Sequence, residues 1–451
     1  MTLNTSTKSG GAVLARRTTL LAAASALSGC SWFDNIFSEK KTPLPGKRDA
    51  IFADRRGLVV DEGAPKVVLP PAVSNAAWPQ AGGNPAHLMG HLAANDHLAE
   101  VWRADIGQGG GKRQILMAQP VVYGGTVFTM DSDAEVSAFN LSDGRRLWRV
   151  DTKPKDVDST NVGGGLGVDG TTLYAVNGLS QLVALDLASG KETWRRDLGV
   201  PARSAPTIAD GRLFVTTIDD HLSAYATADG HPLWTHQAAE PVTSMLGEPA
   251  PAYYQGLVIG GFGSGELAAL RADSGSVAWT DGLGASRGRA SGGDFLSIRA
   301  LPVIVGGLVY AISMGGLLVC NDVPTGRRVW ERQVAGEDTF AIAGDWMFLI
   351  SAQQQIAAVN ITDGRVSWIT DLPRYADPEK RKDTLTWYGP LLVSDRLIVT
   401  GTSEDALSVS PYTGEILGHI TLSAAAAPFA PVVAGGTVLV ITNDGRLLAL
   451  R

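Results

Sequence analysis

The chain has 451 residues, of which 45% are hydrophobic and 18% charged, a balance typical of a globular protein and not of a disordered one. Its formal net charge is −7, so the composition gives no basic excess for binding nucleic acid. Only two cysteines occur, Cys30 and Cys320, which excludes a disulfide framework. Cys320 lies in the apolar run LLVCND and is predicted to be a small buried side chain on a strand.

The N-terminal 30 residues have the pattern of an export signal. Positive charges at Lys8, Arg16 and Arg17 precede a short apolar stretch, residues 20–27, which is too short to span a membrane. The segment ends in Leu-Ser-Gly-Cys, which resembles the lipobox of bacterial lipoproteins. The resemblance implies that Cys30 becomes the mature N-terminus and carries acyl chains such as palmitate, and several chains give stable anchoring. Ser31 after the cysteine favours the outer membrane, with the protein on its periplasmic face.

Residues 31–75 show no repeat and place several prolines among charged residues, so they are predicted to form an extended tether. The segment that follows contains His87, His91 and His97. A spacing of four can bring two imidazoles together on a helix, but no glutamate stands between them as in zinc-binding helices. We expect a loop or short helix here and no metal site.

A repeat occupies the rest of the chain. Glycine is followed four positions later by tryptophan in six phrases such as SDGRRLW, and successive tryptophans are 38 to 51 residues apart. A period of this size is typical of propellers and solenoids. The six pairs are Gly144/Trp148, Gly190/Trp194, Gly230/Trp234, Gly275/Trp279, Gly326/Trp330 and Gly364/Trp368.

Each unit alternates β-branched or aromatic runs with Gly, Asp and Ser turns, which predicts four strands per unit. A seventh unit is degenerate, with Gly418 in the place of the tryptophan, and an eighth stops at Arg451 after its third strand. The stretch AEVWRADIG around Trp102 has the register of the missing fourth strand. We therefore predict an all-β fold for residues 76–451: an eight-bladed β-propeller of four-stranded antiparallel blades, whose last blade is closed by an N-terminal strand.

The glycine of each pair is predicted to take a positive φ in the turn before the last strand, at little steric cost. The tryptophan is predicted to project between neighbouring blades and to hold sheet against sheet. The glycine-rich segment NVGGGLGVDG lacks the lysine of a phosphate-binding loop and is predicted to be a turn between blades. Function is therefore sought in the loops and not at the tryptophans.

The Gly-x-x-x-Trp ending and the PVVYGGTVF opening resemble the repeat of quinoprotein (PQQ) propellers. Within that group, an eight-bladed propeller behind a lipobox is similar to the BamB family of outer-membrane lipoproteins. The resemblance covers nearly everything from Trp78 to Arg451. It implies a non-enzymatic scaffold without cofactor, monomeric within a hetero-complex, which docks on the periplasmic POTRA repeats of BamA and assists insertion of outer-membrane proteins.

The resemblance also implies where the partner binds. The family places an inter-blade loop just before a G-E-x-A-P blade opening, which here is residues 247–251. The second family loop carries two acidic residues ahead of the next blade, a place that this chain fills differently, since Ser297 and Arg299 stand there with an aspartate nearby. The loop over residues 281–300 is long and rich in Gly, Ser and Arg, as a recognition loop can be. The implied partner-binding residues are Thr243, Met245, Leu246, Asp294, Ser297 and Arg299.

Two alternatives remain at this stage. One is a PQQ-dependent quinoprotein dehydrogenase, a class that holds its cofactor under a disulfide of adjacent cysteines, with a calcium ion beside it. Cys30 and Cys320 are far apart in sequence and cannot form that disulfide. The other is a lipid-anchored propeller that binds an unrelated envelope partner. We expect no catalytic residue, no cofactor and no metal site.

Overall fold

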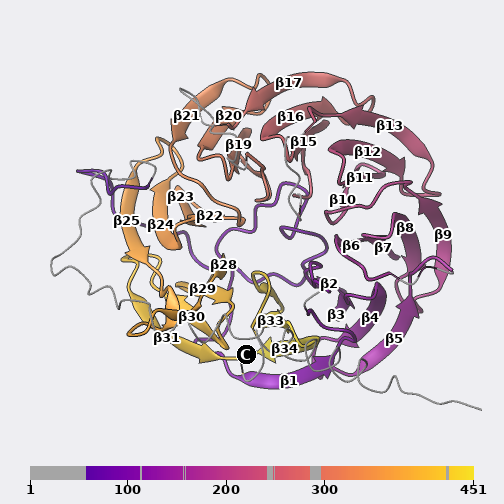
Figure 1. Cartoon of the computed structure of the whole chain (residues 1–451), viewed down its shortest axis with the longest axis horizontal. Coiled ribbons are helices and arrows are strands. Elements are labelled where there is room, and N and C mark those ends of the chain that lie inside the picture. Colours follow the sequence, from indigo (N-terminus) through magenta and orange to yellow (C-terminus); the bar gives the residue numbers. More distant parts are fainter. Residues whose placement is uncertain are drawn as a thin grey trace, which may run out of the picture. The chain divides into compact units, whose positions relative to one another are not determined.

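Short runs of β-branched and aromatic residues separated by Gly and Asp turns fold into 34 strands in the described part of the chain. The computed structural model describes residues 57–451 except for 112–113, 156, 158, 241–246, 248, 285–295 and 423–425. Eight four-stranded antiparallel sheets follow one another around a ring (Figure 1). The predicted eight-bladed propeller is therefore confirmed.

The first four blades follow chain order. Blade 1 is β2 (Val121–Tyr123), β3 (Thr126–Met130), β4 (Glu135–Asn140) and β5 (Arg146–Asp151). Blade 2 is β6 (Gly164–Asp169), β7 (Thr172–Asn177), β8 (Gln181–Asp186) and β9 (Glu192–Asp197). Blade 3 is β10 (Thr207–Ala209), β11 (Arg212–Thr216), β12 (His221–Ala226) and β13 (Pro232–Gln237). Blade 4 is β14 (Ala252–Tyr254), β15 (Leu257–Gly261), β16 (Glu266–Arg271) and β17 (Val277–Gly282).

The remaining blades complete the ring. Blade 5 is β18 (Val303–Val305), β19 (Leu308–Ile312), β20 (Leu318–Asp322) and β21 (Arg328–Arg332). Blade 6 is β22 (Ala341–Ala343), β23 (Trp346–Ile350), β24 (Gln355–Asn360) and β25 (Val366–Asp371). A two-stranded hairpin, β26 (Tyr375–Asp377) and β27 (Lys382–Thr384), precedes blade 7, which is β28 (Trp387–Val393), β29 (Arg396–Gly401), β30 (Asp405–Val409) and β31 (Ile416–Thr421).

The last blade combines the first strand of the described chain with its last three strands. It contains β32 (Val432–Ala434), β33 (Thr437–Thr442) and β34 (Arg446–Leu450), and β1 (Glu100–Asp105) is its outermost strand. Strand β1 pairs antiparallel with β34, with Trp102 opposite Ala449. The predicted closure by an N-terminal strand is confirmed, and it leaves no open gap in the ring.

Glycine and tryptophan of neighbouring blades form the repeated inter-blade contact. Gly326, for example, has φ +71°, and a Cβ atom added there would lie 2.5 Å from Cγ of Trp279 in the preceding blade. The indole Nε1 of Trp279 donates a hydrogen bond of 2.6 Å to the Val323 carbonyl of the same turn. Each tryptophan thus packs on the glycine of the next blade, and not on the glycine four residues before it. The same contact joins Trp102 to Gly144, Trp148 to Gly190, Trp194 to Gly230, Trp234 to Gly275, Trp330 to Gly364 and Trp368 to Gly414.

This contact explains the degenerate seventh unit. A tryptophan at Gly418 in β31 would need a glycine turn between the last two strands of blade 8. Those two strands are the last and the first strand of the described chain, so no turn joins them, and Ala99 and Arg451 exchange backbone hydrogen bonds of 2.9 Å there instead. The seventh unit therefore lacks the tryptophan because the next blade lacks the glycine turn on which it would pack.

The glycine-rich segment of residues 161–170 was predicted to be a turn between blades, but most of it forms a strand. Gly164, Gly165 and Gly167 lie in strand β6. A Cβ atom at Gly165 would lie 2.6 Å from Cβ of Ala205, and one at Gly164 would lie 2.0 Å from the Val176 carbonyl oxygen. The glycines serve close packing of strands near the ring centre.

Residues 75–94 run through the centre of the ring and hydrogen-bond to the innermost strands of the blades (Figure 1). Trp78 exchanges two backbone hydrogen bonds, 2.7 and 2.8 Å long, with Val122 of blade 1. The contacts then follow ring order, as the backbone carbonyls of Pro79, Pro85 and Ala86 accept hydrogen bonds from blades 2, 4 and 5. We call residues 75–94 the axial segment. Its further contacts are Asn75 to blade 8, Gln80 to blade 3 and Leu92 to blade 7.

The residues before the axial segment lie along blade 6. The backbone N–H of Asp61 donates to the Val366 carbonyl at 3.0 Å, and the Asp61 carboxylate pairs with Arg332 at 2.8 Å. Val67 is buried in the core of blade 6. The boundary predicted at residue 75 between tether and propeller stays a prediction, as does the signal at residues 1–30, which lies outside the described residues. Within the described part of the chain, no helix has the length and apolar character needed to span a bilayer.

Candidate functional site

The inter-blade connections gather around a cavity of about 810 Å3 at the ring centre. Strands alternate in direction, so these connections and the turns between second and third strands lie on one face, which we call the loop face. The opposite face, which carries the glycine turns, we call the turn face. The axial segment touches the cavity only through Ala81. The cavity therefore belongs to the loop face, where the sequence predicted function.

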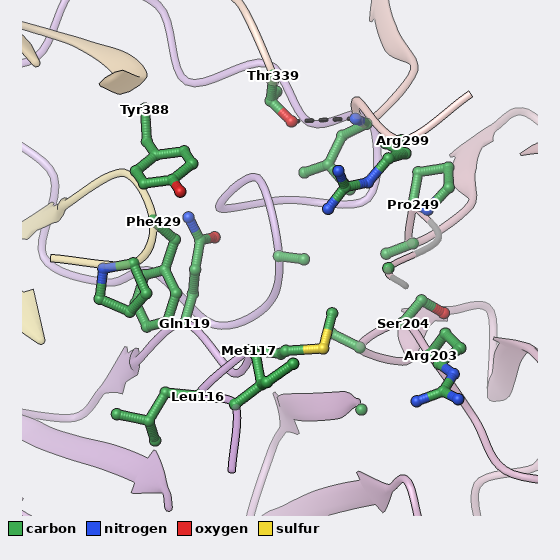
Figure 2. A pocket seen from close by; sticks show the side chains of 18 of the residues that line it. Leu116, Met117, Gln119, Arg203, Ser204, Pro249, Arg299, Thr339, Tyr388 and Phe429 are labelled. Atoms are coloured by element: carbon green, nitrogen blue, oxygen red, sulfur yellow. Dashed lines mark hydrogen bonds between the residues drawn. The ribbon is translucent and has the colours of Figure 1, made fainter. Parts of the chain in front are cut away.

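Residues at equivalent positions in several blades line the cavity, where the position is counted from the first strand of each blade. Arg203, Arg299 and Glu337 each stand four residues ahead of the first strand of their blade, at β10, β18 and β22. Met117 and Pro428 hold that position before β2 and β32. The propeller repeat thus brings residues that are far apart in sequence to one rim (Figure 2).

The charged part of the wall is an ion pair between consecutive blades. Arg299 Nη1 donates to the Glu337 carboxylate at 2.5 Å, and both side chains remain about one quarter exposed, at 27% and 28%. Beside this pair, burial raises the pKa of Asp338 well above its ordinary value, with a further rise from Glu337 and an opposing effect of Arg299. Burial and these two carboxylates likewise raise the pKa of Tyr388.

Apolar side chains form the other part of the wall. Leu116, Met117 and Phe429 line the cavity, and Ile115 is 39% exposed there (Figure 2). Aromatic residues, Met and Arg, which are enriched at the cores of protein–protein interfaces, are present here as Phe429, Tyr388, Met117 and Arg299. The described residues of this wall offer no obvious nucleophile and base pair.

Of the predicted partner-binding residues, the structure describes two. Arg299 lines the cavity, whereas Ser297 is buried, with 2% exposure, and its carbonyl accepts a hydrogen bond from the Met314 N–H. Thr243, Met245, Leu246 and Asp294 lie outside the described residues. Gly247, which follows the first predicted loop, has φ +89°, and a Cβ atom there would lie 3.2 Å from Arg299 Nη2. The end of the first predicted loop and Arg299 of the second thus meet in the cavity.

Sequence reasoning missed Glu337 and Asp338. Their signal was available, because this adjacent acidic pair stands directly before the opening of blade 6, in the register that Arg299 occupies before blade 5. This acidic pair thus stands one blade further along than the place where the family resemblance implied acidic residues. Leu116, Met117 and Phe429 were also missed, since an apolar residue before an apolar strand gives no distinct pattern.

The structure describes one of the two cysteines, Cys320. Cys320 is buried in β20, between Tyr310 and Trp330 on the neighbouring strands, and burial raises the pKa of its thiol to about 11. It occupies the position that alanine holds in other blades, as in Ala138 opposite Trp148. Across the part of the chain that the structure describes, no group of three His, Cys, Asp or Glu side chains could hold a metal ion.

Two of the three histidines in residues 87–97, His87 and His91, are buried and held by backbone groups. His87 is buried in the axial segment, and its Nδ1 lies 2.8 Å from the Pro302 carbonyl oxygen. Burial lowers the pKa of His87 to about 4, against the smaller effect of this hydrogen bond. His91 lies with Nδ1 2.8 Å from the Pro70 carbonyl and with Nε2 3.1 Å from the Asp395 N–H.

Comparisons with known proteins agree on the family. The family model described as outer membrane protein assembly factor BamB matches residues 91–161 and 132–370, together more than half of the chain. The chain is 25% identical over 356 residues to the outer membrane protein assembly factor BamB of Yersinia pestis, which covers 78% of this chain and 88% of that protein. It is 28% identical to the protein of the same name from Salmonella typhimurium, over 355 residues and the same shares.

Solved structures show the same fold. The crystal structure of BamB from Moraxella catarrhalis matches with a TM-score of 0.66 and 18% identity, over 78% of this chain and 99% of that chain. Quinohemoprotein alcohol dehydrogenase from Comamonas testosteroni matches with a TM-score of 0.65 and 13% identity, over 84% of this chain and 81% of that chain. At these identities both show the propeller fold alone. On the family model, the chain belongs to the BamB family of outer membrane protein assembly factors.

Proposed function

We propose that this chain is a non-catalytic, lipid-anchored scaffold of the outer-membrane β-barrel assembly complex. It docks on the periplasmic POTRA repeats of BamA through its loop face and assists insertion of outer-membrane proteins. Family membership supports the role, since the relatives carry the name of outer membrane protein assembly factors. The lipobox-like sequence before Cys30 supports the anchor.

The observation that carries the docking proposal is the composition of the central cavity. A rim of Arg203, Arg299 and Glu337 stands beside the apolar side chains of Ile115 and Met117. A partner segment can bury an apolar anchor there, while the charged rim fixes its register and suppresses wrong partners. Of the residues that the family resemblance implied, Arg299 is the one whose surroundings support a contact. Thr243, Met245, Leu246 and Asp294 remain proposed contacts, and Ser297 is proposed to position the loop from its buried site.

Site-specific photo-crosslinking tests the docking face. A photoreactive residue at Ile115, which is 39% exposed in the cavity, should crosslink to BamA in intact cells. Leu147 on the outer strand β5 is a matched control, because it is 42% exposed on another surface. Equal crosslinking from both positions, or capture of an unrelated envelope protein at Ile115 instead of BamA, would refute the proposed docking.

Two further measurements test the anchor and the absence of catalysis. Cys30→Ser should release the chain from the membrane fraction, because the acyl chains cannot be attached. The purified mature protein should show no quinone absorption band and no calcium-dependent, dye-linked dehydrogenase turnover. A quinone band together with turnover would replace the scaffold proposal with the dehydrogenase alternative.

A further inference from the structure

Among the described residues of the loop face, the connection between blades 6 and 7 stands out because it forms strands of its own. It contains the two-stranded sheet β26–β27, in which Tyr375 pairs with Thr384 and Asp377 with Lys382. We call residues 375–384 the loop-face hairpin. It directly precedes Trp387 and Tyr388, and Tyr388 lines the central cavity.

The base of the hairpin is held firmly. The Trp387 side chain is buried, and its Nε1 donates a hydrogen bond of 2.7 Å to the Pro373 carbonyl. The Trp387 backbone N–H donates to Gln354 of blade 6 at 2.7 Å, and Thr386 bonds to Thr402 of blade 7 at 2.9 Å. The hairpin therefore projects from a base that both neighbouring blades fix.

The hairpin itself is almost entirely exposed. Only Tyr375 and Asp377 among its residues are partly buried, and residues 378–384 are all exposed. An isolated two-stranded hairpin is marginally stable in water. Arg381 and Asp383 add strain, because these non-glycine residues have φ of +50° and +56°. Similar positive φ values occur at turn residues of other blades, such as Asp210 and Gln255, so it is the exposure of the hairpin that makes it a candidate contact element.

The charge of the hairpin tip limits the kind of partner. Lys380 pairs with Asp377 at 3.1 Å, whereas neither Arg381 nor Lys382 has an ion-pair partner among the residues that the structure describes. Glu379 and Asp383 also lack an ion-pair partner among these residues, so the hairpin presents two free cations interleaved with two free carboxylates. Asp377, Glu379 and Asp383 are interleaved with the cations, which weakens attraction to an anionic bilayer but suits a protein surface with a matching pattern.

We propose that the loop-face hairpin is a second docking element, which binds a surface of interleaved acidic and basic side chains on the same protein that occupies the central cavity. This inference rests on the proposed function. The cavity receives the apolar anchor, and the hairpin adds a charged contact beside it. Contacts of this kind chiefly raise the association rate and fix orientation.

The test is the charge-reversal variant Arg381→Glu/Lys382→Glu of the full chain, with affinity measured against full-length BamA in detergent. We expect binding at least about tenfold weaker, with a shallower salt dependence and an unchanged thermal midpoint. Arg145→Glu/Lys191→Glu is the matched control, because both residues are exposed on the turn face and the charge change is equal. The control should bind within about twofold of the wild type.

The outcomes separate this inference from the proposed function. If the hairpin variant binds BamA as tightly as the control while Arg299→Glu weakens binding, the hairpin proposal is wrong and the docking proposal stands. If the wild-type chain fails to bind BamA at all, both are wrong. If the hairpin variant loses only its binding to vesicles containing phosphatidylglycerol, the element is a membrane contact and the proposal is overturned.

Discussion

Substitution of Gly326 by alanine tests the inter-blade contact most directly. A Cβ atom there would lie 2.5 to 2.9 Å from three atoms of Trp279, which is closer than van der Waals contact allows. The indole cannot easily move away, because Trp279 is 8% exposed and its Nε1 is bound to the Val323 carbonyl. In addition, the φ of +71° strains any residue with a Cβ atom.

The magnitude follows from these two effects. Alanine in the left-handed region costs about 1–2 kcal/mol, and overpacking a filled contact costs about 1–3 kcal/mol more. Gly326→Ala should therefore lower the free energy of unfolding by about 2–5 kcal/mol. Gly436→Ala is the matched control, because Gly436 has φ +70° and a Cβ atom added there would have no neighbouring atom within 4 Å. That variant should lose only about 1–2 kcal/mol.

Urea unfolding of the mature chain, followed by far-ultraviolet circular dichroism, measures both values. The difference between the two variants isolates the contact with Trp279, because the backbone strain is shared. Equal destabilisation of Gly326→Ala and Gly436→Ala would refute the view that glycine is required there by the neighbouring tryptophan.

Three further predictions concern side chains that pack inside the propeller. His87 has a pKa of about 4 in the folded protein, whereas an unfolded histidine has a pKa near 6.5. The free energy of unfolding should therefore fall by up to about 3 kcal/mol as the pH decreases between these two values. His87→Asn should flatten this pH dependence, which urea unfolding at several pH values measures. Cys320→Ala should change the free energy of unfolding by less than about 1.5 kcal/mol, since other blades have alanine there, and the native Cys320 thiol should resist alkylation until urea unfolds the chain; rapid labelling of native protein would contradict its burial. Trp102 is partly buried and its Nε1 donates to the Leu141 carbonyl at 3.1 Å, so Trp102→Ala should cost about 2–3 kcal/mol, less than the ~3–5 kcal/mol of a fully buried aromatic side chain, and a cost below about 1 kcal/mol would show that ring closure does not depend on it.

The sequence was sufficient for the ring because its signals are local and repeated. Turn glycines, alternating strands and the tryptophan each recur in most blades, so the blade count and the closing strand Trp102 could be predicted. The pairing of each tryptophan with the glycine of the next blade could not be predicted. Each tryptophan of the six pairs has one glycine four residues before it and another in the next repeat, and the repeat pattern does not distinguish the two. The absence of tryptophan at Gly418 becomes intelligible only once the position of the chain ends is known.

The cavity and the axial segment were less predictable. The rim residues Arg203, Arg299 and Glu337 share a register, but that register becomes visible only when the strand boundaries are known. The axial segment binds the ring mainly through backbone groups, as in the pairing of Trp78 with Val122, and backbone hydrogen bonds leave no side-chain pattern. For the same reason residues 87–97 suggested a loop or short helix and not a segment at the ring centre.

The axial segment has a consequence for how the protein is made. Synthesis and export proceed from the N-terminus, so residues 75–94 emerge before any blade exists, although their hydrogen-bonding partners extend as far as Gly435. Their backbone groups must remain solvated, or be protected by another protein, until the last blade has been delivered. The axial segment is thus synthesised first, and its hydrogen bond to Gly435 can form only when blade 8 is present. Because the blades fold around this segment, folding should be strongly cooperative. A chain truncated before blade 8 should leave the axial segment incompletely bound and accessible to proteases, so that the chain does not reach its native fold.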